Sequence, residues 1–286
     1  PKNTEIVEAV MSVGDKKVET LVLEDSEINS LQIGLIERGP DYDLYRNSDN
    51  TNTMKLYSNI VNYFDGNKYV PVNRKIIPSN TGYDYEVTRG VYKAYFRSDV
   101  TKDDAIKFEK DNKFISYKPI NLNYENVNNV QNIFNFANTN VTVIDNKIVY
   151  ENVINGVDLM YEYLNSMLKE SLIITKLDSL PQPIVKDTDL TLNFLIDYSQ
   201  DLQRNDSNKI DFLKDNKAVF SLSRPYAYDK NKEKINLNYE IKEENNNKIL
   251  KVRVPYSWLS KAVYPVIIDP GPTTISPSDD SEVDED

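Results

Sequence analysis

Residues 141–150, VTVIDNKIVY, hold two short runs of β-branched and aromatic residues separated by Asp145-Asn146. Such side chains pack well on a pleated surface, so each run favours a β-strand. Aspartate and asparagine tolerate the positive φ angles that a two-residue hairpin turn needs. The segment therefore predicts two antiparallel strands, residues 141–144 and 147–150, joined by a tight turn.

Similar runs recur along most of the chain, and several alternate between apolar and polar residues. Alternation with a period of two indicates antiparallel sheets with one solvated face. The expected strands cover residues 18–23, 69–72, 90–96, 114–119, 158–163, 169–174, 190–194, 217–222, 235–241, 249–255 and 264–270. Evidence for helices is confined to short stretches at residues 98–110, 126–136 and 255–259. The sequence thus predicts an all-β fold, a large antiparallel β-sandwich with few short helices, built as one extended sandwich or two abutting ones.

The domain organisation follows from composition. Residues 1–25 form a polar N-terminal segment, and residues 26–271 carry the strand pattern of an all-β domain. Pro181-Gln182-Pro183 marks either a seam between two halves or a loop within one domain. Residues 272–286 are rich in Pro, Ser, Asp and Glu, which predicts an acidic linker to a following domain.

Composition excludes several kinds of chemistry. The chain has no cysteine and no histidine, so thiol nucleophiles, disulfides, thiolate zinc sites and imidazole catalysis are all impossible. The net charge of −11 repels nucleic acid phosphates and anionic lipids, which makes both poor partners. No stretch of about 18 apolar residues is present, so the sequence predicts no membrane span.

Five segments, in order, resemble the region that precedes DNRLRE-type domains in wall-associated, Rhs-like secreted proteins. The segments are ISYKP within residues 114–119, IVYENVINGVDLMY at 148–161, KESLI at 169–173, VFSLSRPYAYD at 219–229 and VYPVIIDP at 263–270. The resemblance covers roughly residues 60–270. It implies an extracellular, cell-wall location and a non-catalytic module that presents downstream domains of the same polypeptide. The first alternative is a carbohydrate-binding module for cell-wall or host glycan, and the second is a glycan-cleaving enzyme.

Aromatic residues provide one candidate ligand site. Tyr83, Tyr85, Tyr92 and Tyr95 lie close together in the sequence, and flat rings can stack on the C–H faces of a sugar. Tyr92 and Tyr95 differ by three positions, so an uninterrupted strand would place them on opposite faces. Packing in the core or across strands is the competing interpretation.

The acidic C-terminus provides a candidate metal site. Asp279, Asp280, Glu282 and Asp284 offer clustered oxygen ligands of the kind that calcium prefers. The segment lacks the glycine and the ligand spacing of a known calcium loop. A solvated linker with no cofactor is the competing interpretation.

Two pairs of charged residues suggest further chemistry. Asp158 and Glu162 could face each other as glycosidase carboxylates, although Asp158 could equally brace the turn near Asn155-Gly156. Lys169 beside Glu170, in a chain rich in asparagine, raises the question of a Lys–Asn isopeptide bond. That bond requires a buried lysine, an asparagine and a carboxyl group in contact.

The strand at residues 264–270 yields a specific packing expectation. Val266 and Ile268 are two positions apart, so they should share one buried face of a sheet. Pro270 cannot donate to a ladder and should mark the end of this strand.

Overall fold

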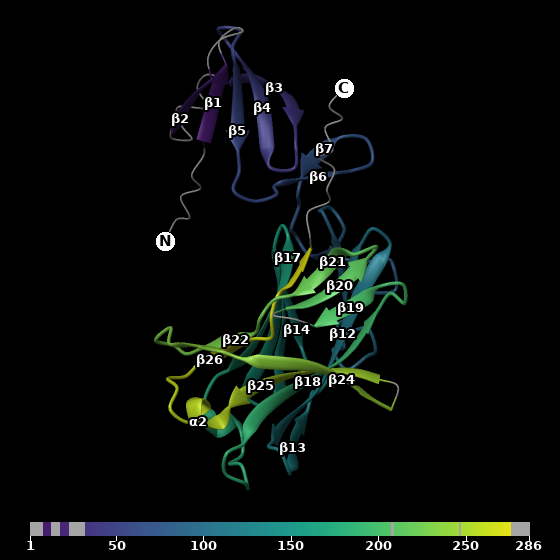
Figure 1. Cartoon of the computed structure of the whole chain (residues 1–286), viewed down its shortest axis with the longest axis vertical. Helices are drawn as coiled ribbons and strands as arrows, with labels where there is room; N and C mark the ends of the chain where they lie inside the picture. The colour runs from purple at the N-terminus through teal and green to yellow at the C-terminus, as the bar shows by residue number, and fades with distance from the viewer. Residues whose placement is uncertain (1–7, 13–17, 23–31, 207–208, 246, 276–286) are drawn as a thin grey trace. The chain divides into compact units, whose positions relative to one another are not determined.

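The computed structural model of the chain describes residues 8–12, 18–22, 32–206, 209–245 and 247–275. The chain divides into two compact units, residues 1–74 with 89–91, and residues 75–88 with 92–286. Antiparallel sheets make up both units, which confirms the all-β expectation (Figure 1). The sequence suggested one domain over residues 26–271, whereas the structure divides near residue 74. The segment at 181–183 lies inside the second unit.

The first unit contains a five-stranded sheet and a small hairpin. The sheet order is β2 (Val18–Val22), β1 (Glu8–Ser12), β5 (Asn52–Leu56), β4 (Tyr42–Asn47) and β3 (Gln32–Arg38), and the hairpin pairs β6 (Asn62–Phe64) with β7 (Tyr69–Pro71). Asn62 Nδ2 donates to Asp43 Oδ1 at 3.0 Å and to the Gly39 carbonyl at 2.8 Å. These buried hydrogen bonds tie the hairpin to the five-stranded sheet.

The second unit contains two large sheets. A nine-stranded sheet runs in the order β24 (Asn238–Glu244), β25 (Asn247–Pro255), β18 (Asp189–Tyr198), β12 (Lys113–Glu125), β11 (Ile106–Lys110), β10 (Lys93–Phe96), β9 (Tyr85–Val87), β8 (Ile77–Pro78), with β13 (Val130–Asn135) beside β12.

The other sheet has eleven strands. Its main order is β14 (Val141–Ile144), β15 (Lys147–Ile154), β16 (Val157–Tyr163), β17 (Met167–Ile174), β27 (Thr273–Ile275), β21 (Lys217–Leu222), β20 (Ile210–Lys214), β19 (Gln203–Asp206). Three short strands join it through β17: β26 (Val266–Asp269), β22 (Tyr226–Tyr228) and β23 (Lys234–Asn236).

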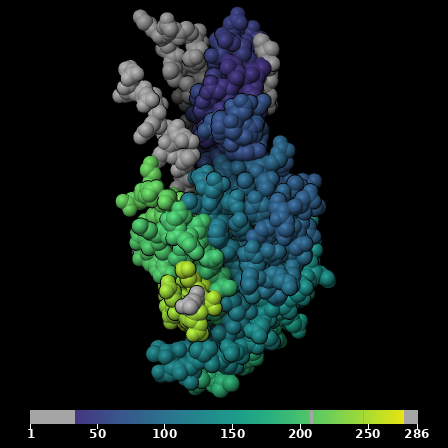
Figure 2. Space-filling model, turned by 90° about the vertical axis from the view of Figure 1, so that its right-hand side faces the viewer, coloured from purple at the N-terminus to yellow at the C-terminus, as the bar shows by residue number. Residues whose placement is uncertain are grey.

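Aromatic side chains join the two large sheets into a sandwich. The rings of Phe108 on β11 and Phe220 on β21 meet edge to face, with centroids 5.4 Å apart. The Tyr117 hydroxyl on β12 lies 2.9 Å from Thr273 Oγ1 on β27. Because buried rings contribute large apolar areas, this core can hold a cysteine-free chain together. Figure 2 shows blue and teal residues from the middle of the chain bordering green residues near position 200 on one face of this unit.

The hairpin predicted at residues 141–150 is confirmed. Ile144 pairs with Lys147, which leaves Asp145 and Asn146 as the turn, and Asp145 has a φ of +53°. The prediction for the strand at 264–270 is also confirmed. Val266 and Ile268 on β26 are both fully buried, and this strand ends at Asp269, directly before Pro270.

Two of the three helical expectations are wrong. Residues 98–105 form turns that lead into β11, and residues 126–129 form a turn that leads into β13. Ile106 and Phe108 are both fully buried. Side chains two positions apart share a face in a strand but not in a helix, so the strand is the conformation that buries both. The helical corner at residues 255–259 is confirmed as α2 (Tyr256–Leu259), and the described residues otherwise hold only the short 3₁₀ helix η1 (Leu177–Ser179).

The C-terminal linker begins later than expected. The sequence placed its start at residue 272, whereas Thr273–Ile275 form β27, which pairs with β17 and with β21. Thr273 and Ile275 are buried between two other strands, and all three residues of this short strand are β-branched, which favours the extended conformation.

Candidate functional site

The outward face of the nine-stranded sheet carries many polar and charged side chains. Leu122, Leu192 and Val252 lie on the side that faces the core, so their strand neighbours point outward. The pairing register aligns Asn121 with Asn193, and Asn193 with Lys251. The outward groups on these strands are Asn121, Asn123, Glu125, Asp189, Thr191, Asn193, Lys251, Arg253, Glu240, Lys242 and Glu244.

The two central strands of this face carry a polar floor, which we define as Asn121, Asn123, Thr191 and Asn193. Three of these residues are buried although they point away from the core: Asn123 is 7% exposed, Thr191 0% and Asn193 4%. Asn193 Nδ2 donates to Asn121 Oδ1 at 2.8 Å. Asn123 Oδ1, Thr191 Oγ1 and Asn193 Oδ1 have no hydrogen-bond partner within the protein. Buried oxygens of this kind are normally satisfied by water or ligand.

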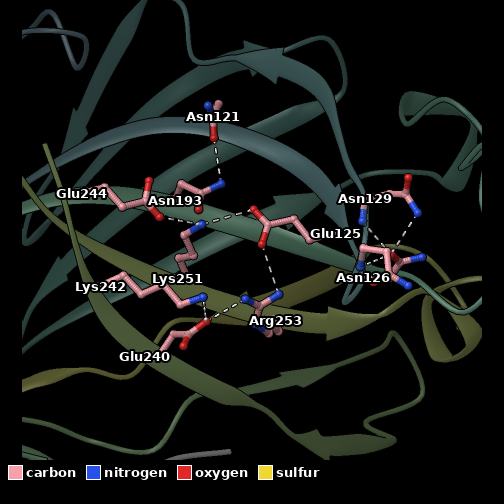
Figure 3. Close-up of polar contacts among 11 residues, drawn as sticks. Asn121, Glu125, Asn126, Asn129, Asn193, Glu240, Lys242, Glu244, Lys251 and Arg253 are labelled. Atoms are coloured by element: carbon pink, nitrogen blue, oxygen red, sulfur yellow. Dashed lines mark hydrogen bonds and ion pairs between the residues drawn. The ribbon is translucent and has the colours of Figure 1, made fainter.

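Charged side chains form a lattice beside this floor, which comprises Glu125, Glu240, Glu244, Lys242, Lys251 and Arg253 (Figure 3). The Arg253 guanidinium donates to Glu125 Oε2 at 3.2 Å and to Glu240 Oε1 at 2.6 Å. Lys251 Nζ lies 3.5 Å from Glu125 and 3.3 Å from Glu244, and Lys242 Nζ lies 3.3 Å from Glu240. Each positive group therefore has at least one carboxylate neighbour.

The electrostatics of the lattice follow from this pairing. Burial raises the pKa of Glu240, but the hydrogen bonds and charges of Arg253 and Lys242 together outweigh burial and leave that pKa below the ordinary value. Asp189 lies on the same face. Desolvation raises its pKa, because the nearby charge of Arg253 offsets the burial of this carboxylate only in part. The lattice thus holds its carboxylates as ion-pair partners. It does not place two carboxyl groups on either side of an open space, one as general acid and the other as base, as glycoside hydrolysis requires.

Two of the four predicted tyrosines meet on the outward face of the same sheet. The rings of Tyr83 and Tyr95 lie with their centroids 5.2 Å apart. The Arg97 guanidinium covers the Tyr83 ring at 4.6 Å, and Lys107 Nζ lies 5.6 Å from the Tyr95 ring. The Tyr83 hydroxyl donates to Asp104 Oδ2 at 2.6 Å. These rings are therefore already engaged by cations of the protein, and Tyr95 is only 9% exposed.

The other two tyrosines lie elsewhere. Tyr92 is 1% exposed and stacks between Phe108 and Tyr163, with ring centroids 4.2 Å away on each side. Its ring is a core element, so the suggestion that it binds a ligand is corrected. Tyr85 pairs with Phe96, on the opposite face of the sheet from Tyr95. The expectation that Tyr92 and Tyr95 point to opposite faces is confirmed.

A pocket of about 280 Å³ opens farther along the same outward face. Ser116 and Lys118 of β12, and Leu195 and Asp197 of β18, lie in register beneath it. The turn before β11 contributes Asp103 and Asp104 to one wall, and Lys248 at the start of β25 contributes to the wall. Lys118 Nζ lies 2.8 Å from Asp103 Oδ1, and this hydrogen bond lowers the pKa of Asp103.

The two charged pairs singled out in the sequence are not assembled as catalytic sites. Asp158 Oδ1 accepts a hydrogen bond from the Asn152 backbone at 2.7 Å, which is a turn-bracing contact. Lys169 and Glu170 are neighbours on β17 and therefore point to opposite sides of the sheet. Lys169 Nζ lies 3.6 Å from Asp269, whereas Glu170 accepts from the Tyr161 hydroxyl inside the core.

The proposed calcium ligands Asp279, Asp280, Glu282 and Asp284 lie outside the described residues, so that role stays a prediction. Within the described ranges, no group of three or more acidic side chains is placed to hold a metal ion. No helix in that part of the chain has the length and hydrophobicity needed to cross a membrane. No family model, curated protein or solved structure matches this chain.

The lattice was not foreseen, although the sequence contains a signal for it. Charges recur at a period of two in both strands: they alternate in sign in EIKEE, residues 240–244, and are both positive in KVR, residues 251–253. Because these runs lie in neighbouring segments of the chain, a hairpin would place the charges on one face.

Replacing Glu125 tests how much the lattice stabilises the fold. Its carboxylate is 5% exposed and holds both Lys251 and Arg253. We expect Glu125→Gln to lower the free energy of unfolding by about 1–3 kcal/mol, because two partly buried cations each lose one of their carboxylate partners. Urea denaturation midpoints would measure this. Glu244→Gln is the matched control, since Glu244 is 51% exposed and should matter little. Equal midpoints for the two variants would contradict the prediction.

Proposed function

We propose that this chain is a non-catalytic structural module of a secreted, wall-associated surface protein, and that it presents other domains of the same polypeptide. The observation that carries the proposal is the lattice. Glu125 on β12 binds both Lys251 and Arg253 on β25, so this part of the outward face is closed by its own side chains. A face of paired charges suits a folded spacer better than a catalyst.

The pairing of β27 on both edges also favours the presenting role. Thr273 pairs with Leu168 on one side and with Leu222 on the other, so the strand has hydrogen-bonded neighbours on both edges. The Tyr117 hydroxyl contacts Thr273 from the facing sheet. The chain beyond residue 275 therefore leaves from a strand that is anchored in both sheets. A domain attached there would be held by the whole sandwich.

Surface display would test the presenting role. The full chain is placed between a wall anchor and a reporter domain on a Gram-positive cell, and antibody access to the reporter is measured by flow cytometry. We expect the folded chain to keep the reporter accessible and resistant to added protease. A variant destabilised in the core should lose that protease resistance. An identical readout for the folded and unfolded chains would contradict the presenting role.

The non-catalytic part of the proposal has a separate test. Purified protein is incubated with peptidoglycan and with plant and host polysaccharides, and the release of reducing ends is followed over time. We expect no sustained release. Hydrolysis that continues through many turnovers, and that a carboxylate substitution such as Glu240→Gln abolishes, would overturn the proposal in favour of a glycan-cleaving enzyme.

A further inference from the structure

We propose that the 280 Å³ pocket over β12 and β18 is a binding site for one neutral sugar ring. The pocket lies on the outward face of the nine-stranded sheet, beyond the part that the lattice closes. Its volume is slightly below the usual range for small-molecule sites, roughly 300–1,000 Å³, so it suits a single ring better than a long oligomer.

The walls of the pocket are held in place before any ligand arrives. Lys118 pairs with Asp103 at 2.8 Å, and Arg97 pairs with Asp104 at 3.0 Å. The Tyr83 hydroxyl fixes Asp104 from the other side at 2.6 Å. Pre-ordered walls reduce the entropy that a ligand must overcome on binding. The two engaged tyrosines, Tyr83 and Tyr95, thus support the wall and do not stack on the ligand.

One charged group of the pocket remains available to a ligand. In the part of the chain that the structure describes, Asp197 makes no ion pair, and its Oδ1 accepts from the Tyr198 backbone at 2.9 Å. Lys248 pairs in register with the buried Ile196, so its side chain lies on the core-facing side of the sheet, with Nζ 4.8 Å from the centroid of the Tyr198 ring. The exposed carboxylate of Asp197 can accept hydrogen bonds from a ligand.

The chemistry of the lining favours a neutral polyhydroxylated ligand. An anion would meet three carboxylates, Asp103, Asp104 and Asp197, and a cation would meet the ammonium group of Lys118. Each hydroxyl of a sugar can both donate to a carboxylate and accept from an ammonium group. The half-buried Leu195 beneath the pocket offers an apolar surface for the C–H face of the ring.

A titration followed by NMR would test the site. The ¹⁵N-labelled full chain is titrated with glucose, galactose, mannose and N-acetylglucosamine, with glucuronate and glucosamine as charged counterparts. We expect at least one neutral sugar to produce saturable shifts at the amides of Ser116, Lys118 and Asp197, with a Kd of about 1 mM. Asp197→Ala should raise that Kd about tenfold, because it removes a charge-assisted hydrogen bond.

Lys242→Ala is the matched control, since Lys242 lies on the same face but outside the pocket and should leave the Kd within about twofold. Thermal melts of all variants would show that they remain folded. The inference is overturned if no neutral sugar saturates the pocket amides, or if Asp197→Ala binds as tightly as the control. It is also overturned if only glucuronate or only glucosamine binds, because the lining would then select charge. None of these results bears on the presenting function.

Discussion

Ile268→Ala is expected to lower the free energy of unfolding by about 2–5 kcal/mol, the usual cost of emptying a fully buried isoleucine site. Ile268 is 0% exposed and lies at the centre of β26. It pairs with Leu172 of β17 and with Ala227 of β22, so the truncation removes contacts on both sides. Denaturant midpoints measured at constant slope would quantify the loss.

The neighbouring residue supplies the control. Ile267 points to the other face of β26 and is only half-buried. Ile267→Ala removes the same atoms from the same strand, so it should cost much less than Ile268→Ala. If both truncations shifted the midpoint equally, burial of one face of this strand would not be what stabilises it. An unchanged midpoint for Ile268→Ala would show that β26 contributes nothing to the core.

Local turn chemistry was the most informative part of the sequence. Asp145-Asn146 closes a two-residue turn as predicted, and the same dipeptide occurs at residues 111–112 and 215–216. Both of these also close two-residue turns, with positive φ at each residue. The dipeptide also occurs at residues 49–50, in the longer turn between β4 and β5, so three of its four occurrences close two-residue turns. Recognising it at residues 111–112 would have indicated that the preceding residues form a strand and not a helix.

Strand lengths were harder to predict because proline interrupts the pattern. The expected strand at residues 114–119 is the first half of β12, which continues through Pro119 to Glu125. The pairing with β18 shifts register between Pro119 and Asn121, which accommodates a residue that cannot donate to the ladder. After this bulge the asparagines and Glu125 point outward. A local reading of the sequence stops at the proline, so it misses the polar floor as well.

Contacts between distant segments could not be read from the sequence. Arg253 reaches Glu125, its partner 128 positions away, only because β18 lies between β12 and β25. The burial of Tyr92 depends in the same way on Tyr163 of the facing sheet. Period-two patterns identify which residues share a face of one strand, but sheet order decides which strands are neighbours. The lattice and the pocket are products of that order.

Glu170 places a carboxyl group inside the sandwich, and the stability of the protein should depend on pH through it. Burial raises the pKa of Glu170 to about 8, although the Tyr161 hydroxyl donates to it at 3.0 Å and opposes the shift. Tyr117 of the facing sheet and Asp269 at the end of β26 are the other titratable groups near it. The folded state therefore favours the protonated carboxyl, while the unfolded chain releases that proton near its ordinary pKa.

The direction of the effect follows from this difference. The stabilisation is complete below the unfolded pKa of about 4.3 and is lost as the pH rises through about 8. Within that window the loss is about 1.4 kcal/mol per pH unit. Glu170→Gln keeps the shape and an oxygen that accepts from Tyr161 but carries no charge at any pH. The variant should match the wild type near pH 4 and become more stable than it by several kcal/mol above pH 8.

Denaturation midpoints of both proteins across this pH range would measure the difference, in which the contributions of other carboxylates cancel. Glu162→Gln is the control, because Glu162 lies on the outward side of β16, half-exposed beside Lys147. Its curve should follow that of the wild type. Parallel curves for wild type and Glu170→Gln would mean that the buried carboxyl is already solvated or ionised in the folded state. A gap that widens with pH would show that the core holds this side chain as an uncharged acid.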